Sequence, residues 1–317
     1  MDELMLRFSR FFIKHRLINL ILIGAATAFF GYKALQLQVF SQFIDLLPRN
    51  HPHIQVYEKY NRQFGSANIV TAAIISKKGS IYDEDVLEKI FGFTDQIDKV
   101  EGVNHDQVSS ITSIRIRDQY IDKEGILQSA QIIGEQAISY LEAQFFTRRY
   151  IERKTERGED IPTTLKELDE MVDRDKRALV KELAPSAALR LELMEDQEAA
   201  EEIKAKREEA AELEFLSLRM RDLPDNYVLN GSEIEGPDGN LLPKETIDTL
   251  PDRIHQNKQV FGRLVSIDDN ASLIVAGFLE GRLDYEAVFT RIREIQAELE
   301  ADGSVEIHLT GQPVLLG

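Results

Sequence analysis

Two histidines and one long charged run are the residues of this 317-residue sequence whose types and spacing suggest chemistry. His51 and His53 flank Pro52, and two neutral imidazoles two residues apart in an extended loop can reach one metal ion. No further imidazole or carboxylate stands at a recognisable ligand spacing from this pair. The pattern therefore favours a turn, and we expect no metal ligand here.

The charged run over residues 195–214 is rich in glutamate, as in a cation-binding patch. Lys204, Lys206 and Arg207 interrupt it, and alternating charges of this kind are typical of a solvated helix face. We therefore assign it no ligand.

Motifs of enzyme chemistry are missing from the sequence. It contains no Gly-rich phosphate loop, no G-x-S-x-G and no HExxH. The lack of cysteine excludes disulfides, thiolate zinc sites and cysteine nucleophiles. A net charge of −17 argues against nucleic acid as a partner, because phosphate binding needs a clustered basic face. We predict that the chain is not an enzyme and has no catalytic residue, no cofactor and no metal.

The most apolar stretch is residues 17–37, in which Lys33 is the one charged residue. As a helix it would extend about 31 Å, enough for a hydrocarbon core of about 30 Å. Basic residues concentrate before it, at Arg7, Arg10, Lys14 and Arg16. The bias of such residues toward the cytoplasm predicts a cytoplasmic segment 1–16, a transmembrane helix 17–37 and a periplasmic remainder.

Two other interpretations of this stretch are a cleaved signal peptide, with Ala26-Thr27-Ala28 as the small-residue site, and a buried core helix. Apolar residues continue at Phe29, Phe30 and Tyr32, where a mature terminus should turn polar. Together with Phe11 and Phe12, these aromatic residues are better explained as markers of the two membrane interfaces.

The remainder of the chain has the patterns of an α+β fold. Residues 38–67 are turn-rich and are predicted to form a periplasmic neck. Residues 68–119 are predicted as a first β-α-β unit, with strands at 68–76 and 107–117. Its helix has Asp83 and Asp85 as possible N-caps and Glu88 as a capping-box partner. The helix should bury a stripe at helical spacing, formed by Val86, Ile90, Phe93, Ile97 and Val100.

Residues 223–317 are predicted as a second β-α-β unit. Residues 264–267 should pair with a strand at 272–279, and a strand should follow at 305–309. The helix between these strands should bury Val288, Ile292, Ile295 and Leu299. Two such units indicate a split ferredoxin-like arrangement.

A helical insertion is predicted between the units, at residues 120–222. One apolar stripe runs from Ile126 to Phe145 and another from Leu165 to Leu183. A third segment, 187–221, is mostly Glu, Lys, Arg and Ala and has little to bury alone. We expect it to project as a helical hairpin or coiled-coil-like arm, with Glu202 and Lys206 as an i,i+4 pair.

Several short motifs, in their order, resemble resistance-nodulation-division (RND) exporters of the lipid-exporting, MMPL-like branch. After the apolar span come Asp45-Leu46-Leu47-Pro48, His51-Pro52, Tyr60, Phe64-Gly65 and Asn68, then Lys99-Val100-Glu101-Gly102-Val103 and finally Thr310-Gly311-Gln312-Pro313-Val314-Leu315. The resemblance covers residues 7–117 and 243–317. The insertion is not part of the basic pattern of that family.

The resemblance implies a proton-driven exporter of hydrophobic small molecules or lipids in a bacterial inner membrane. This chain would supply the first membrane helix and half of the periplasmic porter domain. The proton-carrying residues of the family lie in a later helix, so we expect the chain to continue past Gly317 into a second membrane helix. Substrate-binding residues cannot be assigned. The implied partners are the bilayer, a hydrophobic substrate, and other copies or envelope proteins bound through the insertion.

Two further interpretations remain open. A single-pass periplasmic scaffold or adaptor would explain the membrane segment and the helical insertion equally well. A secretion-motor subunit of the SecD kind would share the β-α-β architecture, but fits residues 47–65 less well.

Overall fold

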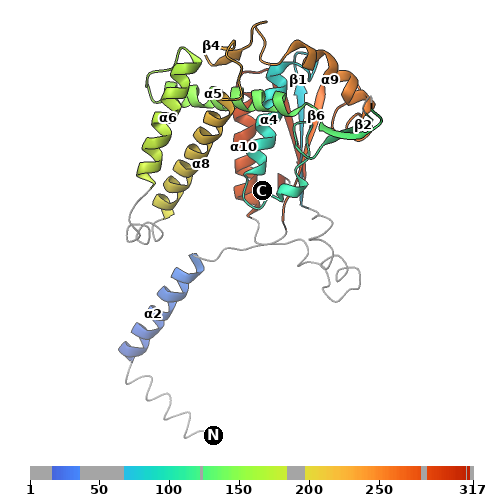
Figure 1. Ribbon diagram of the computed structural model, residues 1–317. Helices are drawn as coiled ribbons and strands as arrows, with labels where there is room; N and C mark the ends of the chain where they lie inside the picture. The colour runs from blue at the N-terminus through green and yellow to red at the C-terminus, as the bar shows by residue number, and fades with distance from the viewer. Residues whose placement is uncertain are drawn as a thin grey trace, which may run out of the picture. The chain divides into compact units, whose positions relative to one another are not determined.

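A computed structural model describes residues 16–35, 68–121, 124–183, 197–279, 284–311 and 313–314 (Figure 1). The chain divides into two units, Met1–Tyr57 and Glu58–Gly317. In the first unit the described residues form helix α2, Arg16–Leu35. The predicted neck, with His51 and His53, lies outside the described residues.

Helix α2 exposes large apolar side chains. Leu20, Ile21 and Ile23 are 71%, 66% and 65% exposed, and Phe29 and Phe30 are also exposed. No described helix combines the length and the apolar character that a membrane crossing needs.

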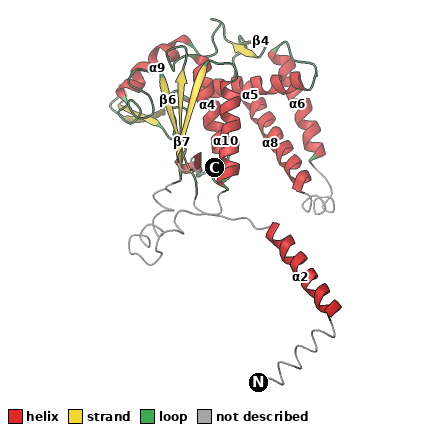
Figure 2. Ribbon diagram, turned by 180° about the vertical axis from the view of Figure 1, so that it is seen from behind, coloured by secondary structure: helices red, strands yellow, loops and turns green. Residues whose placement is uncertain are grey.

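The second unit is built on a three-stranded sheet with the order β6-β1-β7 (Figure 2). Its strands are β1 (Ile69–Ser76), β6 (Ala271–Gly277) and β7 (Val305–Gly311). β6 and β7 both run antiparallel to β1, so they are parallel to each other. Helix α10 (Tyr285–Glu300) connects them across the intervening β1. The predicted α+β class is confirmed.

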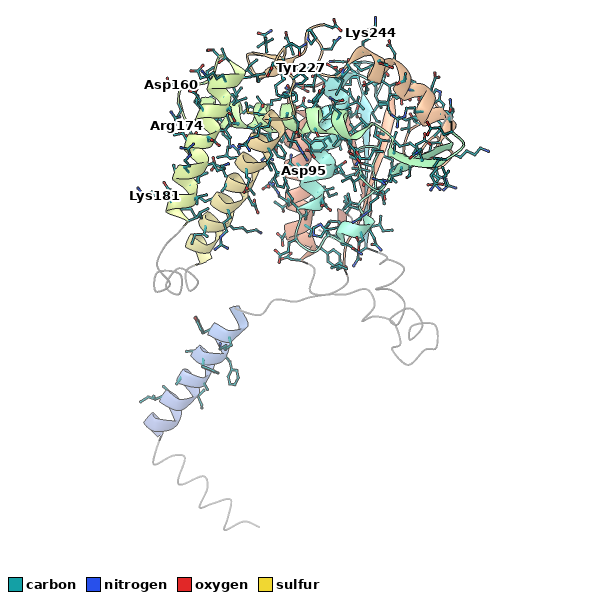
Figure 3. All side chains as sticks on the ribbon, in the orientation of Figure 1. Asp95, Asp160, Arg174, Lys181, Tyr227 and Lys244 are labelled. Carbon is teal, nitrogen blue, oxygen red and sulfur yellow. The ribbon has the colours of Figure 1, made fainter. Side chains whose placement is uncertain are left out.

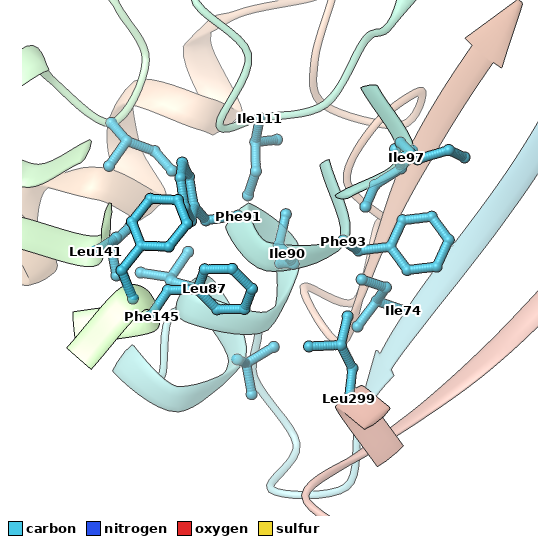
Figure 4. Close-up of a cluster of buried hydrophobic side chains, with 14 of the residues drawn as sticks. Ile74, Leu87, Ile90, Phe91, Phe93, Ile97, Ile111, Leu141, Phe145 and Leu299 are labelled. Atoms are coloured by element: carbon cyan, nitrogen blue, oxygen red, sulfur yellow. The ribbon is translucent and has the colours of Figure 1, made fainter. Parts of the chain in front are cut away.

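Helices α4 (Glu84–Asp98) and α10 pack against each other and against the sheet. The stripes predicted from helical spacing are buried, as Figure 4 illustrates for α4. Asp83 caps α4 by accepting a bond from the backbone N–H of Asp85, and Asp284 caps α10 in the same way. The capping-box role predicted for Glu88 is wrong, because its carboxylate pairs with Arg148 instead. We call β1, β6, β7, α4 and α10 the body.

The strand predicted at 107–117 is wrong for most of its length. Val103 and Ser109 form single bridges to β6, and a turn follows, in which the backbone N–H of Thr112 donates to the Ser110 hydroxyl. Ile111 is buried, whereas Ile114 is 68% exposed. The serine hydroxyls therefore compete with strand pairing.

A hairpin formed by β2 (Arg117–Ile121) and β3 (Leu127–Gln131) occupies the region where the first insertion helix was expected to begin. Gly125 has a φ of 80°, a conformation that glycine adopts without steric cost and that favours a turn. The helix starts only at residue 135.

Helices α5 (Glu135–Glu156), α6 (Leu165–Glu182) and α8 (Gln197–Met220) form the region that we call the helical arm. α6 and α8 pack side by side, and α5 contacts both α8 and α4 (Figures 1 and 2). The third segment was expected to project as a helical hairpin or coiled-coil-like arm, and its described part is a single helix, α8, packed against α6. α8 buries apolar side chains against its neighbours, since Leu213 and Leu216 are 1% exposed.

The chain between the arm and β6 forms a hairpin of β4 (Val228–Asn230) and β5 (Glu233–Glu235), then helix α9 (Lys244–Gln256). The predicted pairing of 264–267 with β6 is confirmed: the N–H of Leu273 donates to the carbonyl of Leu264 at 2.7 Å. Asp269, in the connecting turn, has a φ of 56°.

Two side chains of α10 bond to the backbone of β7. The N–H of Ile307 donates to Glu300 Oε1 at 2.6 Å, and Gln296 Nε2 donates to the carbonyl of Ile307 at 2.7 Å. Both backbone groups of Ile307 are therefore satisfied by side chains.

Candidate functional site

The most unusual group of charges lies where α4, α5 and β5 meet. We call Asp85, Glu88, Arg148 and Glu233 the acid–arginine cluster. Asp85 and Glu88 stand three residues apart on α4, so they share a helix face. Arg148 Nη2 of α5 lies 3.1 Å from Glu88 Oε2, 2.7 Å from Glu233 Oε1 and 3.5 Å from Asp85 Oδ1. One nitrogen atom thus faces three carboxylates.

Polar neighbours hold two of these carboxylates in place. Lys78 Nζ, in the turn after β1, donates to Asp85 at 2.6 Å. Gln144 of α5 donates through Nε2 to Glu233 at 2.9 Å, and its Oε1 accepts from the N–H of Ile234 at 2.6 Å. The β4–β5 hairpin is therefore fastened to α5 beside the cluster.

Glu88 is the most deeply buried carboxyl of the cluster, with a side chain 4% exposed. Burial raises the pKa of Glu88 to about 8; Arg148 opposes this shift, and Glu233 and Asp85 add to it. Burial also acts to raise the pKa of Asp85, but Lys78 and Arg148 outweigh it and hold that pKa below its ordinary value. The cluster can thus hold and release one proton near neutral pH.

A second candidate is a pocket of about 250 Å³ between α5, α6 and α8. Its cations are paired within the arm. Lys154 Nζ lies 2.6 Å from Asp175 and also contacts Glu159, and Arg157 lies 3.1 Å from Glu209. The lining is mostly charged, so it presents little apolar surface to a hydrophobic ligand. These pairs are better explained as the contacts that assemble the arm.

A third group joins α9 to two turns at the edge of the sheet. Tyr82 donates its hydroxyl to Asp269 Oδ1 at 2.7 Å, and His255 Nε2 lies 2.8 Å from Asp269 Oδ2. The ring of His255 packs edge-on against Phe261, with centroids 4.5 Å apart. This arrangement fixes the position of the turn that contains Asp269.

The charged run at 195–214 was predicted to be a solvated face, and within its described part this is wrong for one side of α8. Glu212 is 9% exposed and lies 3.1 Å from Arg149 Nη1 and 2.5 Å from Arg153 Nη1, both on α5. Glu212 lies on α8 and both arginines lie on α5, so the spacing of residues along α8 could not predict these ion pairs. Arg174 and Lys181 lie on the neighbouring α6 (Figure 3).

Among the residues described, no three His, Asp or Glu side chains gather as a metal site.

Sequence reasoning missed the acid–arginine cluster. Asp85 and Arg148 are 63 positions apart, and no local spacing links them. The available signal was an arginine pair, Arg148 and Arg149, directly after the predicted apolar stripe of α5.

The chain matches no known protein-family model, no curated protein and no solved structure.

Proposed function

We propose that this chain is the N-terminal part of a proton-driven, RND-type exporter of hydrophobic small molecules or lipids. In this proposal it supplies the first helix in the bacterial inner membrane and half of the periplasmic porter domain. The observation that carries the proposal is the apolar exposure of α2.

Contiguous exposed apolar surface on a helix calls for a lipid or protein environment. Leu20, Ile21 and Ile23 expose about two-thirds of their surface or more. The basic residues Arg7, Arg10, Lys14 and Arg16 support a cytoplasmic N-terminal end of the span, and Phe29, Phe30 and Tyr32 suit the opposite interface. The proposed span, 17–37, runs past the described end of α2.

The topology of the body supports the porter assignment. Adding the bridges of Val103 and Ser109 beside β6 gives the order of a four-stranded split β-α-β sheet, which we assign as ferredoxin-like. Val70, near the start of β1, pairs with Gly311 at the end of β7. The start of β1 and the end of β7 therefore lie at the same end of the sheet, as in a domain joined to the membrane through both ends.

The helical arm favours a second candidate, a membrane-anchored scaffold or adaptor. Phe215 and Leu218 stand three residues apart on α8 and are each 48% exposed. Neighbouring apolar side chains of this size on a charged helix suit contact with another protein. In the exporter proposal the same surface would bind other copies or envelope partners.

Topology is tested with a reporter that is active only in the periplasm, fused after Gly79. We expect an active, membrane-bound product, whereas a matched fusion before Arg16 should be inactive. A soluble product that begins near Phe29 would indicate a signal peptide instead.

Transport is tested in cells that carry the complete gene. We expect them to retain less of a hydrophobic fluorescent dye than cells without it, and an uncoupler of the proton gradient should remove the difference. A Leu20→Arg, Ile23→Arg variant should lose export, and a Thr27→Ser variant should keep it. Equal dye retention in all strains, together with co-purified envelope proteins that depend on Phe215, would favour the adaptor.

A further inference from the structure

We propose that Glu88 is a proton-binding residue whose protonated form holds α4, α5 and β5 together, so that this junction weakens as the pH rises. The inference goes beyond the proposed function, since it concerns the second unit alone and holds for an exporter or an adaptor.

The geometry of Arg148 is the first step. Its Nη2 atom carries two hydrogens, yet oxygens of three carboxylates lie within 3.5 Å of it. Two of the three can accept a bond from this atom, and the third is left with a negative charge and no donor there. A proton on one of the three carboxylates would remove this uncompensated charge.

The exposure of the three carboxylates decides where a proton goes. Asp85 and Glu233 are 37% and 48% exposed, and Lys78 and Gln144 also bond to them. Glu88, at 4%, has no such access to water. An ionised carboxylate costs most where burial is greatest, so the proton belongs on Glu88.

The charges that face Glu88 come from each packed element. α5 contributes Arg148, whereas Glu152, one turn further along the helix, is exposed to solvent. β5 contributes Glu233; α4 itself contributes Asp85 and Lys89, whose ammonium pairs with Asp302 at 2.5 Å. From α10, Glu298 pairs with Arg149 at 3.4 Å. Lys78 in the turn after β1 is drawn to Asp85. Burial has the largest effect and favours the neutral form of Glu88; Arg148 and Lys89 favour its ionised form, and Glu233 and Asp85 oppose them.

The direction of the pH effect follows from linkage. The folded pKa of Glu88, about 8, lies above its ordinary value of 4.5. We call the junction closed when α4, α5 and β5 are packed together and open when they separate and Glu88 meets water. Between these two pH values Glu88 is protonated in the closed junction and ionised in the open one. Raising the pH through this range therefore increases the equilibrium constant for opening, by up to roughly tenfold per pH unit. The increase levels off above the pKa of Glu88 in the closed junction.

The test uses the full chain in lipid nanodiscs. Hydrogen exchange of β5 and α5 amides is compared between wild type and Glu88→Gln, at each pH from 5 to about 9. The ratio of the two exchange rates at the same pH does not depend on the intrinsic exchange rate of the amides, which itself changes with pH. Glutamine keeps the shape of protonated Glu88, so we expect protection in wild type to fall with pH relative to the variant. Glu152→Gln, which neutralises a nearby exposed carboxyl, should behave as wild type.

A second readout does not depend on protection. Infrared difference spectra should show a protonated carboxylic acid that titrates near neutral pH and is lost in Glu88→Gln. Glu233→Gln, which removes a neighbouring negative charge, should lower the pH of this titration. The proposal is overturned if the band persists in Glu88→Gln, or if the protection ratio stays constant with pH.

Discussion

The body and the helical arm are stabilised in different ways. Side chains such as Ile74, Ile90 and Ile292 in the body are fully buried, and their contribution comes from apolar surface removed from water. The arm also has apolar contacts, but it buries the ammonium of Lys154 and joins α5 to α8 through Arg153 and Glu212. Buried ion pairs contribute little net stability but cost much when one partner is lost.

The difference shows which interactions fix position and which supply stability. Apolar stripes in the body are held by many dispersion contacts that are individually weak and not directional. Ion pairs in the arm need matched partners at set distances, such as the 3.1 Å between Arg157 and Glu209. The arm is therefore specified in orientation by charges, and the body is stabilised by its volume of buried hydrocarbon.

The largest effect is expected in the body. Ile292→Ala should lower the free energy of unfolding by about 2–5 kcal/mol, because it leaves a cavity between α10 and the sheet. Denaturant unfolding followed by circular dichroism measures this. Thr290→Ala, on the exposed face of the same helix, should change it by less than about 0.5 kcal/mol. A similar small loss for Ile292→Ala would show that the core re-forms around the cavity.

An intermediate effect is expected in the arm. Lys154→Met keeps the aliphatic stem but leaves Asp175 and Glu159 without the ammonium between them. These carboxylates are 22% and 44% exposed, so water compensates in part and we expect a loss of about 1–3 kcal/mol. Peptide-level hydrogen exchange should show the change in α5 and α6 and none in the body.

Lys166→Met is the matched control, since Lys166 is 88% exposed and lies 3.9 Å from Glu170. Its exchange pattern should equal that of wild type. Faster exchange in the sheet of the Lys154→Met protein would contradict the separation of the two regions.

The smallest effect is expected on the surface of the arm. Glu202→Ala removes the carboxylate 2.9 Å from Lys206, a pair exposed to solvent. Such exposed pairs contribute little to stability, and salt screens them. We expect a small loss at low ionic strength that disappears at high salt. A larger loss that survives high salt would mean that Glu202 contributes through packing and not through its charge.

Local periodicity predicted most of the body. Val86, Ile90 and Ile97 repeat at helical spacing and are buried together on α4. The prediction of a strand at 107–117 is wrong because the Ser110 hydroxyl bonds to the backbone in a turn. The spacing of apolar residues does not indicate such a bond. The β2–β3 hairpin was missed because the apolar residues at Ile126 and Ala130 also fit a helical stripe.

Local sequence patterns did not predict the candidate site. Glu88, three residues after Asp85, matched a capping box, and that match concealed its pairing with Arg148. Only the packing of α5 across α4 brings the guanidinium to the carboxylate. A sequence specifies such a contact through the whole fold, so it appears in no window of neighbouring residues.

The bonds that Gln296 and Glu300 make to Ile307 bear on self-association. An outer strand with free amide and carbonyl groups is a template on which another extended chain can add, and natural sheets obstruct such edges. Here α10 supplies the obstruction, with one amide and one carboxylate occupying the groups that an incoming strand would need at the middle of β7. The same helix that covers the face of the sheet thus also limits its growth sideways. This protects the fold from joining neighbouring copies strand to strand into fibres.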